Sequence, residues 1–300
     1  MNVLITGPSG FVGKNLVEYL SGDPQFSVVP QSIRSSSIFD FSADCYVHLA
    51  GKAHDISNKS ANEEYMLVNY ELTRALYDHF LVDEHANCFV FVSSIKAVAD
   101  TANNIAIKEE TEAAVETIYG ISKRKAEDYI MSNLPGPSKR VYILRPCMIH
   151  GPGNKGNLNL LFKMIKTGIP YPLAAFHNER SFLSIENLCF VIREILSSDR
   201  IAPGIYNLSD DTPLSTNEVI NIISSELGRK PRLMAVNPGL IKVVAKIGDY
   251  FRLPLNSKRL QKLTESYVVD NTKIRKALGR PFPVNALEGL RRTIRSFRKN

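Results

Sequence analysis

The stretch Asn2-Val-Leu-Ile-Thr-Gly-Pro-Ser-Gly-Phe-Val-Gly13 decides the fold of this chain. It begins with an apolar run typical of a buried strand, and apolar residues at helical spacing continue from Val12 to Leu20. Between the two patterns, Gly7, Gly10 and Gly13 have the spacing GxxGxxG. In such a loop the first glycine permits a tight turn, the second lets backbone approach a pyrophosphate, and the third lets the helix pack against its strand. The loop therefore predicts a dinucleotide-binding turn, and the alternative is a turn that serves packing alone.

Strand-like and helical patterns alternate after this loop. Short continuous apolar runs at 45–50, 88–92 and 141–144 are typical of strands that are buried on both faces of a parallel sheet. Helical patterns cover residues 63–81 and 119–131. The alternation predicts an α/β fold with a Rossmann-type, doubly wound parallel sheet.

One connection in this half is too short for a complete crossover. Only about a dozen residues separate Arg34 from the run at 45–50, and a crossover helix needs more. We therefore expect a brief strand at 37–41 with no helix beside it.

The second half of the chain predicts a smaller C-terminal α/β lobe that binds substrate. A glycine-rich loop follows His150 and interrupts the alternation of strand-like and helical patterns. Helical patterns then return, one with Asn187 as a plausible cap and one that starts at Ser215 or Thr216 with Glu218. The amphipathic segment 240–248 is interpreted as a packed helix rather than a membrane anchor.

These patterns divide the chain into two domains. Residues 1–148, with about 183–208, form the dinucleotide-binding Rossmann domain, and residues 149–182 and 209–300 form the substrate lobe. The Rossmann domain is therefore interrupted by the first part of the lobe.

The composition, with 44% hydrophobic and 22% charged residues, is that of an ordinary globular protein. The net charge is +7, and basic residues gather between Arg291 and Lys299. We interpret them as a solvated terminal helix; contact with an anionic membrane surface and attraction of anionic substrates are the alternatives. The chain has no nucleic-acid motif, and no apolar stretch reaches the roughly 18 residues of a membrane span. We expect neither a nucleic-acid partner nor an integral membrane segment.

The cysteines and histidines do not form metal-binding patterns. Cys45, Cys88, Cys147 and Cys189 have no CxxC spacing and no histidine at metal-ligand spacing. Three of them lie in apolar runs, so we expect reduced, buried thiols in a cytoplasmic protein. We predict no structural metal.

The chemistry that the sequence predicts rests on Tyr119-Gly-Ile-Ser-Lys123, with Ser94 upstream. A tyrosine transfers protons near neutral pH only if its pKa, about 10 unperturbed, is lowered. A lysine four residues later on the same helix lies one turn away, so its charge can lower that pKa. A serine at the end of a strand can hydrogen-bond the same substrate oxygen. With the glycine loop, Ser94, Tyr119 and Lys123 predict nicotinamide-dependent catalysis on a carbinol or carbonyl.

The choice of cofactor depends on the end of the second strand. An NAD-binding loop commonly carries an Asp or Glu there for the ribose hydroxyls. This chain has Ser32 and Arg34 instead, and an arginine with hydroxyl partners suits a 2′-phosphate. We therefore favour NADP over NAD; the alternative is that Arg34 is solvated and Asp40 binds the ribose.

A series of motifs, in this order along nearly the whole chain, resembles an extended short-chain dehydrogenase/reductase of the NAD-dependent epimerase/dehydratase family, which works on nucleotide sugars. The motifs are Thr6–Gly13, His48-Leu-Ala-Gly51, Asn69, Val92-Ser-Ser94, Tyr119–Lys123, Arg145-Pro146, Arg180–Leu188, Tyr206-Asn-Leu208 and Asp270–Gly279. The resemblance implies that Tyr119 is the general acid/base at a sugar hydroxyl or ketone. It also implies that Lys123 holds the nicotinamide ribose and that Ser94 hydrogen-bonds the reacting oxygen.

The loop and the resemblance together predict two sets of binding residues. The cofactor contacts are Gly7, Ser9, Gly10, Phe11, Val12, Gly13, Ser32, Arg34, Leu49, Ala50, Gly51, Asn69, Ser93, Tyr119, Lys123 and Pro146. The substrate contacts are Ser94, Lys96, Met148, Asn157, Leu158 and Arg180. Arg180 matches an arginine that contacts the nucleotide, which suits a guanidinium because it stays charged and can bond two oxygens.

Two departures from the family pattern narrow the reaction. The 4,6-dehydratases of the family follow their active-site Ser or Thr with Asp-Glu, whereas Ile95-Lys96 follows Ser94 here. Elimination of water therefore lacks its carboxylates. Met148 stands where many UDP-sugar epimerases of the family carry an asparagine, which indicates different diphosphate contacts, a different sugar or a different base.

Three functions fit this pattern. The first is a 4-epimerase of a UDP-linked hexose or N-acetylhexosamine, and the second is an NADPH-dependent reductase of a nucleotide-linked 4-keto-6-deoxy sugar. The third is an NAD(P)-binding sensor without catalysis, which would have no need to keep Ser94, Tyr119 and Lys123 together. By resemblance, the setting is polysaccharide precursor synthesis, and a homodimer would form through the helix that carries the tyrosine and the one before it.

Overall fold

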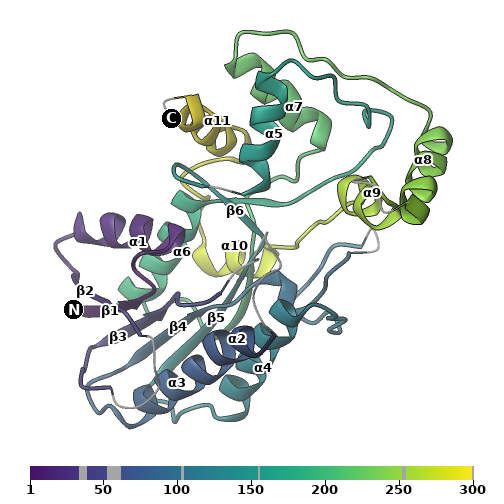
Figure 1. Ribbon diagram of the computed structural model, residues 1–300. Helices are drawn as coiled ribbons and strands as arrows, with labels where there is room; N and C mark the ends of the chain where they lie inside the picture. Colours follow the sequence, from purple (N-terminus) through teal and green to yellow (C-terminus); the bar gives the residue numbers. More distant parts are fainter. Residues whose placement is uncertain (34–38, 53–61, 103–104, 155, 252–254, 299–300) are drawn as a thin grey trace.

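The computed structural model describes residues 1–33, 39–52, 62–102, 105–154, 156–251 and 255–298. Within these residues, six strands form a parallel sheet in the order β2-β1-β3-β4-β5-β8 (Figure 1). The strands are β1 (Asn2–Thr6), β2 (Ser27–Gln31), β3 (Cys45–His48), β4 (Cys88–Val92), β5 (Arg140–Pro146) and β8 (Gly204–Leu208). The predicted doubly wound sheet is confirmed.

Helices cover both faces of this sheet, which explains the continuous apolar runs. Every side chain of β3 and β4 is buried. One face packs against α1 (Phe11–Ser21), α6 (Ile185–Ser197) and α10 (Thr272–Leu278). The other face packs against α3 (Leu72–Val82) and α4 (Ile118–Ser132). Strands between two helical layers need apolar side chains on both faces, so they do not alternate with polar ones.

The order of the strands places a crevice at the carboxyl ends of β1 and β3. The chain leaves β1 to form β2 on one side and returns to form β3 on the other. Loops that leave neighbouring strands in opposite directions open a crevice at such a switch point, where ligands of open α/β sheets bind. The glycine loop follows β1, and Leu49 to Gly51 follow β3.

The brief strand expected at 37–41 is wrong for residues 39–41, the part of it that the structure describes. The rings of Phe39 and Phe41 both contact the His79 ring, with centroids 5.5 and 5.3 Å away. The carbonyl of Phe41 lies 2.7 Å from His79 Nε2. Side-chain packing on α3 therefore holds this segment, and its backbone acceptor is not available to a strand ladder.

A second hydrophobic cluster forms the lobe in the upper part of Figure 1. Its short strands β6 (Met148–His150) and β7 (Phe182–Ser184) pair in parallel beside the main sheet. Its helices are α5 (Asn157–Lys166), α7 (Thr216–Glu226), α8 (Pro238–Phe251), α9 (Ser257–Thr264) and α11 (Ala286–Arg298). Since α10 packs against β8, the segment 209–300 contributes to both clusters. The domain boundaries remain a prediction.

Two helix caps can be compared with the sequence. The helix start at Ser215 and Glu218 is confirmed, because the two residues form a reciprocal capping box. Asn187 is not a cap: Ser184 caps α6 by accepting from the N–H of Glu186. The Asn187 amide is buried and donates to Asp210 and to the carbonyl of Val284.

Candidate active site

The glycine loop after β1 has the geometry of a diphosphate cradle. Gly7 has φ +68°, and a Cβ there would lie 2.8 Å from the backbone nitrogen of Ala50. A Cβ on Gly13 would overlap the Gly7 carbonyl oxygen and lie 2.7 Å from Pro8 Cα. Both positions therefore require glycine, the first for its backbone conformation and the second because α1 approaches the loop so closely.

The start of α1 leaves backbone donors for an anion. Gly10 is the N-cap and offers no side-chain acceptor, and the first turn holds no acidic residue. Free N–H groups and the positive end of the helix dipole favour a bound phosphate here. Ser9 and Gly10 are exposed beside these donors, whereas Phe11 and Val12 pack against the core of the sheet domain.

A buried chain of hydrogen bonds fixes the loop after β3 against the glycine loop. The hydroxyl of Thr6 accepts from the N–H groups of Leu49 and Ala50, at 3.2 Å each. It also lies 2.7 Å from Nδ1 of His48, whose Nε2 lies 2.8 Å from the hydroxyl of Thr73. Thr73 donates to the carbonyl of Asn69, so it accepts from His48 Nε2–H, and Nδ1 accepts from Thr6.

His48 is locked in its neutral form by this environment. Burial, with a smaller contribution from the charge of Lys123, lowers the pKa of His48 to about 3. Thr6, His48 and Thr73 were absent from the predicted site residues. They position the loop rather than face the crevice, and only their polarity within apolar runs could have drawn attention to them.

Asn69 lies in a π-helical turn (Leu67–Glu71) between α2 (Asn62–Met66) and α3. The predicted helix at 63–81 is therefore continuous but widened at this residue. The fully buried Asn69 amide accepts from the N–H of Lys52 at 2.7 Å and donates to the carbonyl of Lys52 and to Ser122. Both of its N–H bonds are used in this way, so Asn69 ties the loop after β3 to α4. Its predicted cofactor contact remains a prediction.

The predicted catalytic residues lie together at the carboxyl end of β4 and the start of α4. Ser94 follows β4 and caps a short 3₁₀ turn (Ile95–Ala97) by accepting from the N–H of Lys96 at 3.2 Å. Thr117 caps α4, and Asp100 accepts from the N–H and hydroxyl of Thr117. This capping orients the first turn, where Tyr119 hydrogen-bonds the side chain of Ser94.

The predicted lowering of the Tyr119 pKa by Lys123 is not found. Burial raises the pKa of Tyr119 above its ordinary value, and the hydrogen bond with Ser94 opposes this only in part. The ammonium of Lys123 instead donates to the carbonyl of Val92 at 3.1 Å and lies 4.8 Å from the centre of the Phe91 ring. Spacing of four residues put both side chains on one face of α4, but the buried carbonyl determines where the ammonium points.

Lys123 is itself strongly perturbed. Burial lowers its pKa to about 8, and the carboxylate of Glu127 one turn later opposes the shift. Glu127 forms a buried ion pair with Arg145 at 2.6 Å. A Cβ on Gly51 would lie 3.0 Å from the ammonium, so Lys123 reaches the backbone of the loop after β3.

These features fit a dinucleotide along the crevice. The glycine loop and the start of α1 suit its diphosphate, and Lys123 with Tyr119 lies at the far end. Ser93, between them at the end of β4, has a buried hydroxyl with no hydrogen-bond partner among the described residues. A buried, unpaired hydroxyl is costly unless a ligand uses it. Pro146 is buried where β5 ends, Ser32 is exposed after β2, and Arg34 lies outside the described residues.

Two of the predicted substrate residues form a cationic group. The Lys96 ammonium donates to the carbonyl of Asp100 and lies 4.2 Å from the centre of the Tyr267 ring. Burial lowers the pKa of Lys96, the carboxylates of Asp100 and Glu265 oppose this, and the charges of Lys262 and Arg180 add to it. Arg180 is thus close enough to Lys96 for repulsion, which an anion between them would relieve.

The Arg180 guanidinium is only partly satisfied. It donates to the backbone carbonyls of Lys262 and Glu265, but its Nε is buried with no partner among the residues that the structure describes. Burial lowers its pKa, with Glu265 opposing. Like Lys96, Arg180 therefore presents a partly desolvated positive charge.

The other predicted substrate residues differ in how they can act. Asn157 is exposed at the first position of α5, whose N-cap, Gly156, offers no side-chain acceptor. Leu158 is buried in the core of the lobe, so its side chain cannot reach a polar substrate. Met148 is partly buried in β6 and packs against the same core.

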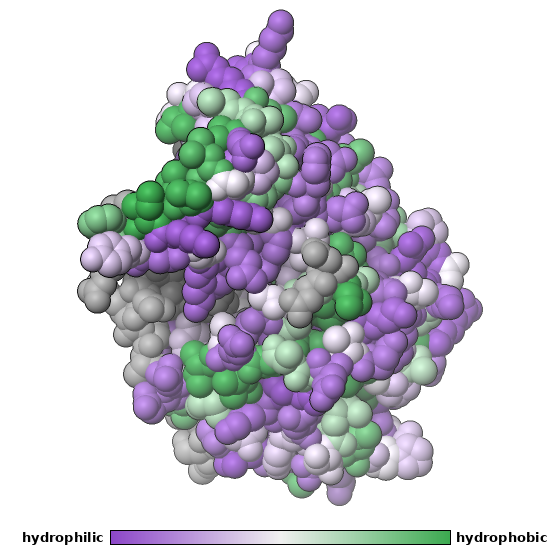
Figure 2. Space-filling view, turned by 90° about the vertical axis from the view of Figure 1, so that its right-hand side faces the viewer, coloured by the Kyte–Doolittle hydropathy of each residue, from purple (hydrophilic) through white to green (hydrophobic). Residues whose placement is uncertain are grey.

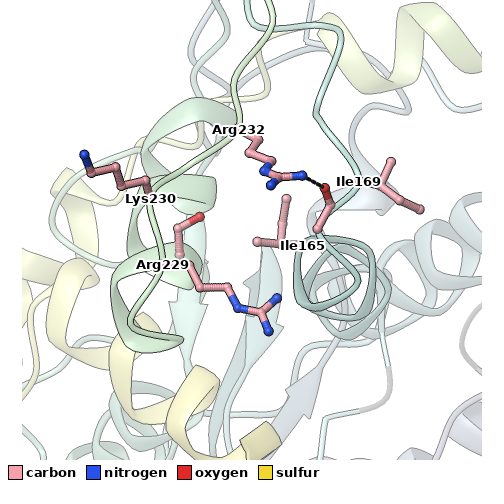
Figure 3. A pocket seen from close by; sticks show the side chains of 7 residues that line it. Ile165, Ile169, Arg229, Lys230 and Arg232 are labelled. Carbon is pink, nitrogen blue, oxygen red and sulfur yellow. Dashed lines mark hydrogen bonds between the residues drawn. The ribbon is translucent and has the colours of Figure 1, made fainter.

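A separate hollow of about 320 Å³ lies in the lobe between α5 and α7 (Figure 3). It is lined by Ile165, Gly168, Ile169, Ser224, Arg229, Lys230 and Arg232. Arg229 and Arg232 donate to the carbonyls of Lys166 and Gly168. None of the predicted site residues lines this hollow, so it is distinct from the crevice.

The described residues contain neither a candidate metal-binding group nor a candidate membrane span. Among the described residues, no three His, Cys, Asp or Glu side chains are grouped so that they could hold a metal ion. The four cysteines are free and buried. No helix in the described ranges is long and apolar enough to cross a membrane.

Comparisons with known proteins agree with this geometry. Residues 3–209 match the model of the "NAD dependent epimerase/dehydratase family". The chain is 28% identical to a UDP-glucose 4-epimerase of Vibrio cholerae, over 99% of the chain and 95% of that protein. It is 32% identical to a UDP-2-acetamido-2,6-beta-L-arabino-hexul-4-ose reductase of Pseudomonas aeruginosa, over 53% of the chain and 38% of that protein.

A solved structure shows the same fold. A UDP-glucuronic acid 4-epimerase from Bacillus cereus, in complex with NAD, superposes with a TM-score of 0.76 at 16% identity, covering 100% of this chain and 99% of that one.

Proposed function

The chain belongs to the NAD-dependent epimerase/dehydratase family and is an NAD(P)-binding enzyme, and from this premise we propose that it is a 4-epimerase of a UDP-linked hexose or N-acetylhexosamine. The observation that carries the proposal is the hydrogen bond between Tyr119 and Ser94 beside the buried Lys123. These residues lie at the same edge of the sheet as the glycine loop, where the parallel strands have their carboxyl ends. A bound nicotinamide would accept and return the hydride of the sugar carbon.

The residues of the chain would handle the proton. Burial raises the pKa of Tyr119, so the phenol is protonated near neutral pH and can donate to a 4-keto oxygen that Ser94 also holds. For the reverse half-reaction the phenol must lose its proton to become a base. The hydrogen bond with Ser94, which lowers the pKa of Tyr119, would stabilise that phenolate.

The substrate anion would lie between the cationic residues. Lys96 and Arg180 repel each other and are partly desolvated, which favours a diphosphate between them. The exposed Asn157 at the uncapped start of α5 would add backbone donors. Ile95 and Lys96 leave no carboxylate beside Ser94, which argues against a dehydratase.

The second candidate is an NADPH-dependent reductase of a nucleotide-linked 4-keto-6-deoxy sugar. It would use the same Ser94, Tyr119 and Lys123. Only the half-reaction in which Tyr119 donates a proton to the keto oxygen is needed. The observation that favours it is the absence of a carboxylate at Gln31, the last residue of β2, and at Ser32 and Ile33, which follow it. Arg34 would then bind a 2′-phosphate, and NADPH would be the preferred cofactor.

Mass spectrometry of the cofactor and sugar nucleotide retained on purification tests the two candidates. Tightly held NAD, with interconversion of the two C4 epimers of a UDP-sugar without net cofactor consumption, supports the epimerase. Steady oxidation of NADPH by a 4-keto sugar nucleotide supports the reductase. If the protein binds NAD(P) but neither reaction proceeds, both candidates fail and a non-catalytic NAD(P)-binding role is indicated.

The cofactor preference has a separate test. Arg34→Asp should weaken NADPH binding more than NADH binding, because the carboxylate repels the 2′-phosphate, and Ser32→Ala is the neutral control. Equal effects on the two cofactors would contradict the assignment of Arg34. The homodimer, the cytoplasmic location and the role in polysaccharide precursor synthesis remain predictions.

A further inference from the structure

Helix α8 of the lobe presents a large apolar face to solvent. Six of its side chains are between 44 and 83% exposed, namely Leu240, Val243, Val244, Ile247, Tyr250 and Phe251. At 3.6 residues per turn they fall within an arc of roughly 120°. Figure 2 faces the side where Figure 1 draws α8, and apolar surface gathers there at the height of that helix.

The packed side of α8 is narrow. Only Ile241, Ala245 and Gly248 are buried, and a Cβ on Gly248 would overlap the carbonyl of Leu255, so the helix lies tightly on the segment that follows it. The segment 240–248 is thus packed as predicted, but only through the narrow strip of buried residues on one side of the helix. Scattered exposed apolar residues are ordinary, whereas a contiguous apolar face marks an interaction surface.

The charges around this face are positive, with one exception. Lys242 and Lys246 are exposed on the helix edge next to the apolar arc. Lys258 and Lys262 are exposed on α9, which packs against α8 and contains no acidic residue. The one acidic residue of α8, Asp249, accepts two hydrogen bonds from Ser257. The surface is therefore apolar in the middle and cationic around it.

This combination fits an anionic membrane surface. Interfacial helices bury an apolar face at the boundary of headgroups and acyl chains, while lysines beside it meet anionic headgroups and aromatic residues lie at the interface. Tyr250 and Phe251 supply the aromatic residues. A second copy of this chain would instead bring the same lysines against one another, which disfavours a symmetric dimer through this face.

We propose that α8 docks the substrate lobe on anionic lipid bilayers, with its exposed apolar face in the interface and its lysines on the lipid headgroups. The inference does not depend on the proposed reaction, because neither the six exposed apolar residues of α8 nor Lys242 and Lys246 are among the residues of the crevice. It also differs from the basic terminal helix considered above, since Arg292 and Arg295 of α11 are paired with Glu186 and Glu226.

Sedimentation of the full-length protein with vesicles tests the proposal. Vesicles of phosphatidylcholine with phosphatidylglycerol should bind the protein more tightly than phosphatidylcholine alone, and added salt should weaken the binding. The double variant Lys242→Gln/Lys246→Gln should bind roughly 30-fold more weakly, since each cation near an anionic surface contributes about fivefold. Lys125→Gln/Lys276→Gln, with the same change in charge on exposed residues of α4 and α10, is the control and should change binding less than about twofold.

A second pair of variants, matched in exposure, tests the apolar face of α8. Val243 and Leu134 are each 54% exposed, but Leu134 lies after α4 in the other domain. Val243→Glu should weaken vesicle binding at least tenfold and Leu134→Glu should not, with unchanged melting temperature and NADPH affinity for both. Absence of vesicle binding by the wild type, or equal binding by Val243→Glu, overturns the proposal. So does a dimer that Val243→Glu converts to monomers without loss of vesicle binding, because the face would then join two copies.

Discussion

The substitution Gly13→Ala tests the diphosphate cradle most directly. A methyl group there would overlap the Gly7 carbonyl oxygen and stand 2.7 Å from Pro8 Cα, where an ordinary contact is about 3.4 Å or more. Helix α1 must therefore retreat by at least roughly 0.7 Å, or the loop must open. Overpacking of this kind costs about 1–3 kcal/mol of folding free energy.

The retreat also moves the free N–H groups of α1 away from a bound diphosphate. Loss of one hydrogen bond to a charged group costs about 1.5–3 kcal/mol of binding free energy, which corresponds to a roughly 10- to 150-fold larger dissociation constant. Titration of NADPH fluorescence measures this constant, and the chain has no tryptophan to overlap the signal. Urea unfolding measures the change in stability.

Two other glycines separate affinity from stability. At Gly10 the nearest heavy atom to a new Cβ lies 3.4 Å away, so Gly10→Ala should fold normally but hinder approach of the pyrophosphate and weaken binding. At Gly22, at the opposite end of α1, the nearest atom lies 3.6 Å away, so Gly22→Ala should change neither quantity. Wild-type affinity and stability in Gly13→Ala would refute the cradle.

Three further substitutions probe the catalytic end of the crevice. Tyr119→Phe should lower turnover by about 10²- to 10⁴-fold and leave the NADPH dissociation constant within about twofold; near-normal turnover would remove Tyr119 from the mechanism. Burial lowers the pKa of Lys123 from 10.5 to about 8, so the unfolded chain binds more protons between these pH values and stability rises across that window. Between pH 8 and 10.5, the free energy of unfolding of the wild type, measured with urea, should rise by roughly 3 kcal/mol relative to that of Lys123→Met. A difference between the two proteins that does not change with pH would show that the ammonium is not buried. Glu127→Gln leaves Arg145 buried without its carboxylate and should cost about 3–5 kcal/mol, much of it recovered in Glu127→Gln/Arg145→Met; an unchanged single variant would contradict the buried pair.

Local sequence patterns predicted the sheet and the grouping of its site. The runs at 45–50 and 88–92 became β3 and β4 because a strand buried on both faces needs no polar alternation. The glycine spacing predicted the turn because its requirement is steric and involves neighbouring residues only. Ser94 and Tyr119 lie together because Ser94 follows the carboxyl end of β4 and Tyr119 is in the first turn of α4, which begins at the same edge of the sheet.

Other features depend on contacts between distant residues, which spacing does not contain. Thr6, His48 and Thr73 form their chain of hydrogen bonds only after three elements pack, and their polarity within the sequence does not show which partners they will have. Phe41 faces α3 instead of joining the sheet, because His79 takes its carbonyl. The amphipathic pattern of α8 identified an apolar side, but it could not show that the core covers only part of it.

The pKa values of Tyr119 and Lys123 move apart, from ordinary values of 10.0 and 10.5. Burial penalises the phenolate and the ammonium alike, which raises the first pKa and lowers the second to about 8. The hydrogen bond with Ser94 opposes the first shift only in part. Glu127 shifts the balance toward the charged lysine, because its carboxylate lies one turn further along α4. Lys123, Glu127 and Arg145 thus form a buried series of alternating charges behind Tyr119, and the series keeps the ammonium charged in spite of its burial.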